Sequence, residues 1–265
     1  MIINALTIAG SDSGGGAGIQ ADIKTFSALG AYGASVITAL TAQNTQGVRG
    51  VMPVPPDFIR AQCEAVFDDI RIDSVKCGML ANAEVIETVA QCLTRYRPSV
   101  FVLDTVMVAK SGDTLLDKEA IGALRDVLLP LADLITPNLP EAAALLQIEV
   151  ARDEDTMREQ GRALLQAGAR AVLMKGGHLR GDESPDWLIT PSEEIRFASP
   201  RMTGKHTHGT GCTLSAALTA LKPCYATWQE TIEEAKSWMQ GAFREAERLQ
   251  VGSGIGPLHH FYRIW

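Results

Sequence analysis

The chain has 265 residues, enough for one large α/β domain or two ordinary ones, and its 46% hydrophobic content is sufficient for a buried core. With 21% charged residues, it is neither a disordered chain nor a coiled coil. The net charge of −7 and the lack of a clustered Lys and Arg run exclude a protein that binds nucleic acid through its phosphate backbone.

Short apolar runs alternate with longer segments of helical periodicity. Five runs are predicted as buried strands, at residues 2–9, 34–40, 100–103, 134–136 and 171–174. Six segments are predicted as helices, at residues 19–29, 57–70, 83–95, 118–128, 139–146 and 154–167. A hairpin at 187–190 and 195–198 follows, and then helices at 212–221 and 227–248. This order predicts a three-layer α/β/α fold with a central, mostly parallel sheet, in one domain spanning residues 1–265.

The first predicted strand is followed by a glycine-rich segment, GSDSGGGAG at residues 10–18. Residues 16–21 fit the dinucleotide pattern GxGxxA, which needs an acidic residue about 20 positions further on to hold a ribose hydroxyl. Residues 36–43 contain none, so a Rossmann oxidoreductase is disfavoured. A flexible loop with capping Ser and Asp is the simpler alternative. We favour a loop whose glycines let the backbone lie against a ligand.

A second glycine cluster, THGTGC at residues 207–212, precedes a helix of small and apolar residues. Free N–H groups at a helix start form a cradle for phosphate or an oxyanion. A P-loop is excluded because the chain contains no GxxxxGK[ST]. Cys212 lies in the first turn of this helix, where the helix dipole is expected to lower the pKa of its thiol.

The five cysteines form no CxxC pair and are odd in number, which disfavours a disulfide framework and a zinc site and indicates a reducing compartment. Apart from Cys212, they are predicted to be structural. The chain has no run of 18 apolar residues and no signal-peptide pattern at its N-terminus. A cytoplasmic protein without a membrane partner is expected.

Three charged residues follow predicted strands at the same sheet edge. Asp104 and Glu141, taken singly, read most simply as helix caps. Beside an anion cradle, however, two carboxylates and phosphate oxygens are common ligands of Mg²⁺. Lys175 follows an apolar run and would offset phosphate charge there. Together with the cradle and the thiol, these groups match the requirements of phosphoryl transfer.

Six segments of this chain, taken together, resemble the hydroxymethylpyrimidine/phosphomethylpyrimidine kinases of bacterial thiamine biosynthesis. They are residues 10–22, 42–45, 104–107, 136–142, 174–178 and 207–212. Their order and spacing run through nearly the whole chain. The resemblance implies a ribokinase-like fold and usually a homodimer. It also implies ATP-dependent phosphorylation of 4-amino-5-hydroxymethyl-2-methylpyrimidine to its monophosphate and then to the diphosphate.

The resemblance also implies a pyrimidine pocket. In it Gln43 would read the pyrimidine through its amide. The walls of that pocket would include Gly10, Asp22, Met79 and Val106.

On the phosphate side, the resemblance assigns Asn138 and Glu141 to a magnesium and phosphate motif, with Asp104 nearby. Lys175 would contact the transferred phosphates. The anion hole would be formed by Gly209, Thr210 and Gly211.

The sugar kinases of this fold carry an aspartate base where this chain has Cys212, so the thiolate is expected to take the proton of the substrate hydroxymethyl group. His206 stands where relatives often have Asp or Asn, and we assign it no role. Two other functions stay open at this point. One is a pyridoxal or pyridoxine kinase of the same fold, and the other is a binding module that has lost the chemistry.

Overall fold

A computed structural model describes residues 1–107, 116, 118–201 and 204–265. In these described residues, nine strands form one sheet in the order β3-β2-β1-β4-β5-β6-β7-β8-β9. They are β1 (Asn4–Asp12), β2 (Tyr32–Asn44), β3 (Gly47–Pro53), β4 (Ser74–Cys77), β5 (Phe101–Leu103), β6 (Leu134–Ile135), β7 (Val172–Lys175), β8 (Asp186–Ile189) and β9 (Glu194–Phe197). In the centre of the sheet, the neighbouring strands β2, β1, β4, β5, β6 and β7 pair in parallel. Strand β3 pairs antiparallel with β2 at one edge, and β8 and β9 pair antiparallel at the other.

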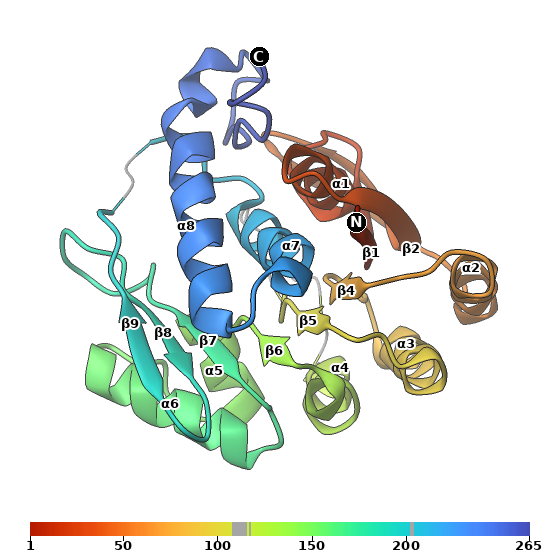
Figure 1. Cartoon of the computed structure of the whole chain (residues 1–265), viewed down its shortest axis with the longest axis horizontal. Coiled ribbons are helices and arrows are strands. Elements are labelled where there is room, and N and C mark those ends of the chain that lie inside the picture. The colour runs from red at the N-terminus through yellow and green to blue at the C-terminus, as the bar shows by residue number, and fades with distance from the viewer. Residues whose placement is uncertain (108–115, 117, 202–203) are drawn as a thin grey trace.

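Helices cover both faces of the sheet, as Figure 1 shows. Those of the described residues are α1 (Gly18–Ala28), α2 (Pro56–Phe67), α3 (Ala83–Tyr96), α4 (Lys118–Ala123), α5 (Leu139–Leu146), α6 (Glu154–Gln166), α7 (Thr210–Leu221) and α8 (Trp228–Arg244). Helices α1, α7 and α8 lie on one face, and α2 to α6 lie on the other. Each face therefore has its own apolar core, with Trp238 of α8 filling much of one and Val89 of α3 lying in the other.

This arrangement confirms the predicted three-layer fold, the parallel centre and the antiparallel hairpin at one edge. Two strands were not predicted. Strand β3 is exposed and contains Gly, Arg and Pro, so it lacks an apolar pattern. Strand β4 is buried throughout but carries Lys76 in its middle, which interrupts the apolar run that marks a buried strand. The predicted helix at 118–128 becomes α4 followed by a π-helical turn at Leu124–Leu128.

The helices differ in how their N-termini are closed. Side chains of Asn82, Asn138, Asp153 and Thr227 accept hydrogen bonds from the first turns of α3, α5, α6 and α8. In the described chain no side chain caps α1 or α7. Helix α2 also has no side-chain cap. Cys212 accepts from the Gly18 N–H of α1, whereas the first N–H groups of α7 are left for another acceptor.

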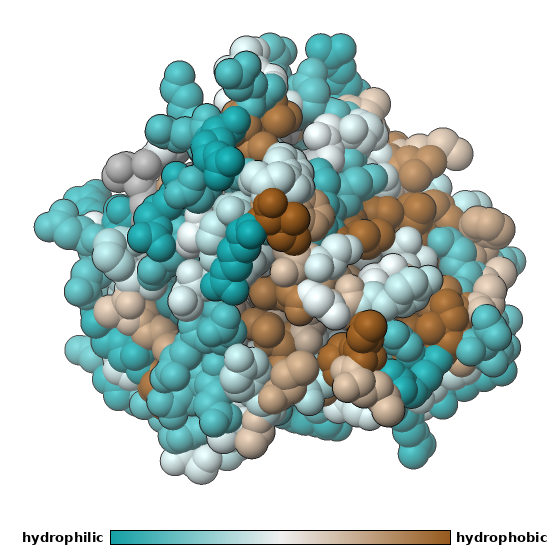
Figure 2. All heavy atoms as spheres, turned by 45° about the horizontal axis from the view of Figure 1, so that its top comes forward, coloured by the Kyte–Doolittle hydropathy of each residue, from teal (hydrophilic) through white to brown (hydrophobic). Residues whose placement is uncertain are grey.

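The surface is mainly hydrophilic at the rim of the view in Figure 2, with apolar residues gathered toward the middle and right. Large exposed apolar side chains at the β3 edge of the sheet include Leu40, Val51 and Met52. Among the described residues, no helix has the length and apolar character needed to cross a membrane.

Candidate active site

A cavity of about 1080 Å³ lies at the carboxyl ends of the parallel strands. Its lining includes every site residue predicted from the sequence except Asp22. The lining includes Gly10, Gln43, Met79 and Val106, which are residues of the predicted pyrimidine pocket. It also includes the predicted phosphate-binding groups, Asp104, Asn138, Glu141, Lys175, Gly209, Thr210, Gly211 and Cys212.

The start of α7 forms an anion-binding corner of this cavity. Gly209 precedes the helix with a left-handed backbone (φ +76°), which glycine adopts without strain. A Cβ atom on Gly209 would lie 1.9 Å from the carbonyl oxygen of Gly16, so the glycine loop and the α7 start touch through their backbones. The first helical N–H groups, of Thr210, Gly211 and Cys212, precede the first intrahelical bond, which Thr213 donates to Gly209. This corner therefore offers N–H donors and the positive end of a helix dipole to an anion.

Lys175 stands beside two carboxylates at this corner. Its Nζ atom lies 3.3 Å from Asp104 Oδ1 and 3.9 Å from Glu141 Oε2. Burial favours the neutral amine, but the charges of Asp104 and Glu141 outweigh it and raise the pKa of Lys175. The ammonium is thus held charged in a site that is mostly closed to solvent.

The two carboxylates differ in their surroundings. Asp104 is 1% exposed and accepts hydrogen bonds from Ser215 Oγ (3.1 Å) and Thr136 Oγ1 (3.3 Å) as well as from Lys175. Although burial opposes ionisation, Lys175 and Lys76 lower the pKa of Asp104. Burial and the neighbouring Asp104 charge raise the pKa of Glu141, and Lys175 offsets this only in part.

Glu141 also belongs to a helix cap, as the simpler alternative predicted. Asn138 Oδ1 accepts from the Glu141 N–H (2.9 Å), and Glu141 Oε2 accepts from the Asn138 N–H (2.8 Å). Thr105 Oγ1 donates to the same oxygen (3.1 Å). Within the described chain, the hydrogen bonds to this carboxylate use Oε2, and Glu141 lines the cavity.

The expected low pKa of Cys212 is wrong. Burial raises the pKa of the Cys212 thiol to about 11, and the carboxylates of Asp22 and Asp104 act in the same direction. Lys76 and the Gly18 N–H at the start of α1 lower the pKa, but they do not compensate. Desolvation of the thiolate thus outweighs the cation and the N–H group that favour it.

Asp22, predicted to line the pyrimidine pocket, instead lies beneath the cavity. It is fully buried, and both of its oxygens lie 2.8 Å from Lys76 Nζ. Thr7 Oγ1 donates to Asp22 Oδ2 at 2.7 Å. Burial alone would lower the pKa of Lys76, but Asp22 raises it above its ordinary value. Burial also raises the pKa of Asp22, and Lys76 and Thr7 offset this in part. Lys76 itself reaches the cavity wall near Cys212.

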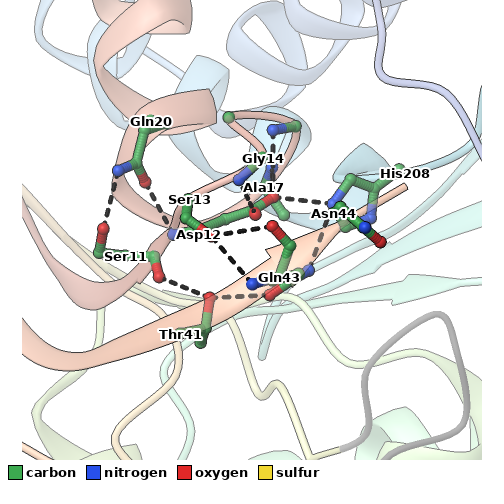
Figure 3. A network of polar contacts seen from close by, with 12 residues as sticks. Ser11, Asp12, Ser13, Gly14, Ala17, Gln20, Thr41, Gln43, Asn44 and His208 are labelled. Atoms are coloured by element: carbon green, nitrogen blue, oxygen red, sulfur yellow. Dashed lines mark hydrogen bonds and ion pairs between the residues drawn. The ribbon is translucent and has the colours of Figure 1, made fainter. Parts of the chain in front are cut away.

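A polar network joins the glycine loop to the α7 corner (Figure 3). The Asp12 carboxylate accepts hydrogen bonds from the N–H groups of Gly14 (2.8 Å), Gly16 (3.1 Å) and Ala17 (2.9 Å). Its Oδ2 atom also lies 2.8 Å from His208 Nε2. This carboxylate therefore organises the loop and ties it to the residue that precedes Gly209.

Sequence reasoning assigned no role to Lys76, His208 or Lys236, which all line the cavity. A lysine inside an otherwise apolar strand was a readable signal for Lys76. Lys236 of α8 pairs with Asp186, whose Oδ1 accepts from the Gly176 N–H (3.0 Å). Neither contact could be read from spacing, because the partners are distant in the chain.

The fold and this site define a small-molecule kinase with a ribokinase-like architecture, in which a helix N-terminus, a lysine and the predicted substrate pocket line one cavity. Residues 12–259 match the model of the phosphomethylpyrimidine kinase family, and the chain belongs to that family.

Solved structures and curated relatives agree with this assignment. The hydroxymethylpyrimidine/phosphomethylpyrimidine kinase of Escherichia coli (strain K12) is 61% identical over 263 residues, which cover 99% of each chain. A pyridoxal kinase from Bacillus subtilis, solved as an ADP complex, superposes with a TM-score of 0.91 at 36% identity and full coverage of both chains. A phosphomethylpyrimidine kinase from Clostridium difficile 630 gives a TM-score of 0.81 at 44% identity and covers 91% of this chain and 99% of its own.

Proposed function

We propose that this kinase transfers the γ-phosphoryl group of ATP to 4-amino-5-hydroxymethyl-2-methylpyrimidine and then to the resulting monophosphate, as a step of thiamine biosynthesis. The observation that supports the proposal is that Gln43, the α7 corner and Lys175 line one cavity. An amide can pair with the amino and ring-nitrogen edge of an aminopyrimidine, and the corner can hold the phosphate that moves. The full-length similarity to kinases named for both activities supports the same substrates.

In the first reaction, the hydroxymethyl oxygen attacks the γ-phosphorus in line, and the bond to the bridging oxygen of ADP breaks. The hydroxyl proton passes to the Cys212 thiolate. Since burial raises the pKa of Cys212 to about 11, the thiolate is a minor form at neutral pH but a strong base. Lys175 and the N–H groups of Gly209, Thr210 and Gly211 stabilise the charge that spreads over the phosphoryl oxygens.

In the second reaction, the nucleophile is a phosphate group. Its second pKa is about 6, so it is ionised at neutral pH and needs no base. The same corner and Lys175 would serve both reactions. This division of labour makes Cys212 necessary for the first phosphorylation only.

The donor set fits a magnesium ion. Mg²⁺ is bound by one or two carboxylates together with substrate phosphates and water. Within the described ranges no group of three or more His, Cys, Asp or Glu side chains could hold a metal, so the protein would supply few ligands. We assign Glu141 Oε1 as the first of these ligands, with Asp104 behind it holding Lys175. When bound, Mg²⁺ would neutralise charge on the transferred phosphates. Asn138 would position Glu141 through the helix cap.

We also propose that residues 1–265 act as one kinase domain, that the enzyme is cytoplasmic, and that it is a homodimer. All nine described strands belong to one sheet, and all five cysteines are free, as a reducing compartment requires. A second copy would cover the exposed edge strand β3 and the apolar side chains of Leu40, Val51 and Met52. Light scattering that gives the mass of a monomer would contradict the dimer.

A side-by-side assay tests the substrate assignment. The pyridoxal kinase alternative rests on the TM-score of 0.91 to a pyridoxal kinase, whereas the identity of 61% favours the pyrimidine. We expect kcat/KM with ATP to be highest for the hydroxymethylpyrimidine and its monophosphate. A higher kcat/KM on pyridoxal would assign the pocket to that vitamin instead.

A further inference from the structure

The proton on His208 can be placed from its neighbours. Three backbone N–H groups already donate to the Asp12 carboxylate, and His208 Nε2 is its fourth neighbour, at 2.8 Å. Although burial opposes ionisation, the hydrogen bonds from His208 and the loop lower the pKa of Asp12. An ionised carboxylate only accepts hydrogen bonds, so His208 Nε2 carries the hydrogen and donates it.

This proton conflicts with the Gln43 amide as it is drawn in Figure 3. Gln43 Nε2 lies 3.4 Å from His208 Nε2, which places two donors face to face. A protonated ring nitrogen has no lone pair to accept with. At the other end of the amide, Thr41 Oγ1 lies 3.1 Å from Gln43 Oε1 and 2.9 Å from the Ser11 carbonyl oxygen. One hydroxyl hydrogen would have to serve both acceptors.

Exchanging the oxygen and nitrogen of the Gln43 amide removes both conflicts. Thr41 then donates to the Ser11 carbonyl and accepts from Gln43 Nε2, and His208 Nε2–H faces Gln43 Oε1 as a weaker second acceptor. The orientation of a glutamine amide follows from the hydrogen bonds that its two ends can make. Thr41, His208 and one N–H of the Gln43 amide then each have an acceptor, and the second amide N–H is left for the substrate.

We propose that Asp12 and His208 are positioning residues that hold the Gln43 amide with its oxygen toward His208 and its nitrogen toward Thr41. This role rests on the proposed function of Gln43 as the group that reads the pyrimidine. Asp12 acts through His208, and His208 acts through Gln43. The Asp12 carboxylate also accepts hydrogen bonds from the backbone of the glycine loop, so it links the conformation of this loop to substrate recognition.

The orientation of the amide decides which way the substrate faces. A 4-aminopyrimidine offers a ring-nitrogen acceptor beside an amino donor, so its amino group pairs with Gln43 Oε1 on the His208 side. Around the ring, the order is the acceptor nitrogen, the carbon that bears the amino group, and the carbon that bears the hydroxymethyl group. The hydroxymethyl group therefore lies on the amino side of this edge. It is therefore turned toward His208, the residue from which the chain continues into Gly209 and the α7 corner. The reverse orientation would turn it toward Thr41.

Histidine-selective ¹⁵N NMR of the full chain tests the first step without any substrate. At neutral pH we expect His208 as the tautomer with hydrogen on Nε2. A tautomer with hydrogen only on Nδ1 would overturn the proposal. This result does not depend on which substrate the enzyme uses, so it separates a failure of this inference from a failure of the proposed function.

Substrate discrimination tests the second step. The 4-oxo analogue of the pyrimidine carries N–H at the ring nitrogen and an acceptor oxygen at position 4, so it needs the reverse amide. We expect the ratio of kcat/KM for the amino and oxo substrates to fall about tenfold in His208→Leu, whose Gln43 is free to rotate. His208→Gln restores a donor toward Asp12 and Gln43 and should restore the ratio. The KM for ATP serves as the control for folding.

An unchanged ratio in His208→Leu, with both substrates slowed alike, would reduce His208 to a structural role and overturn the proposal. The ring packs against Gly16, where an added Cβ would lie 2.4 Å from His208 Cδ2, so this variant could fail to fold. Thr41→Val then gives the second test. It keeps a β-branched residue on β2 and removes the acceptor for Gln43 Nε2. We expect it to lower the ratio as well, and a ratio equal to that of the wild type would contradict the assignment.

Discussion

Replacing Cys212 with alanine should separate the two phosphorylations. The alcohol substrate must lose a proton during attack, and Cys212 is the group assigned to take it. The monophosphate is already ionised above its second pKa of about 6. We therefore expect Cys212→Ala to lose about 10²–10⁴-fold in kcat on the alcohol, which is the usual contribution of a general base. The rate on the monophosphate should change little.

The pH dependence of the wild-type rates provides a second test of Cys212 as the base. The pKa of Cys212 is raised to about 11, so the thiolate fraction grows about tenfold for each pH unit below that value. Between pH 7 and 10, kcat on the alcohol should rise with this slope, and kcat on the monophosphate should stay level. In Cys212→Ala the slope on the alcohol should disappear.

Steady-state assays of both substrates at saturating ATP measure these rates. Cys224→Ala is the matched control, because that cysteine is exposed and does not line the cavity. Equal losses on the alcohol and the monophosphate in Cys212→Ala would refute the base assignment. A pH profile on the alcohol that is flat from pH 7 to 10 would refute it independently.

Three further predictions concern the walls and the floor of the cavity. Gln43→Ala should weaken pyrimidine binding by about 1–3 kcal/mol and leave ATP binding intact, and calorimetric titration that shows unchanged pyrimidine affinity would remove Gln43 from the site. Changing Asp104 to Asn and Glu141 to Gln together should raise the magnesium concentration needed for half-maximal turnover, whereas an unchanged requirement would leave both as structural groups. Lys76→Met should lower the free energy of unfolding by about 3–5 kcal/mol because it leaves Asp22 buried without a charged partner. Adding Asp22→Asn should recover most of that loss in denaturant titrations, and no recovery would contradict the charged pair.

The fold could be predicted because its evidence is local. Apolar runs of strand length alternate with helical periodicity, and this pattern specifies a parallel sheet between helices. Strand β4 was missed because Lys76 breaks its apolar run, and only the distant Asp22 makes a buried lysine possible there. Strand β3 was missed because its side chains are exposed and it is held mainly by backbone pairing with β2.

The candidate site could be predicted as a set but not in its internal contacts. Residues that follow parallel strands meet at one sheet edge, which brought Asp104, Glu141 and Lys175 together as expected. The direction of the pKa shift of Cys212 could not be predicted. The sequence places the thiol in the first turn of a helix, but it does not show the burial that raises the pKa. The pairing of Asp12 with His208 joins residues 196 positions apart and has no signal in spacing.

A ³¹P NMR time course tests most directly whether one cavity carries out both phosphorylations. With ATP, magnesium and the hydroxymethylpyrimidine, the monophosphate should appear first and then be converted to the diphosphate by the same enzyme. In Cys212→Ala, added monophosphate should still be converted, while the hydroxymethylpyrimidine is consumed far more slowly. A wild-type reaction that stops at the monophosphate, or a variant that loses both conversions equally, would contradict the account.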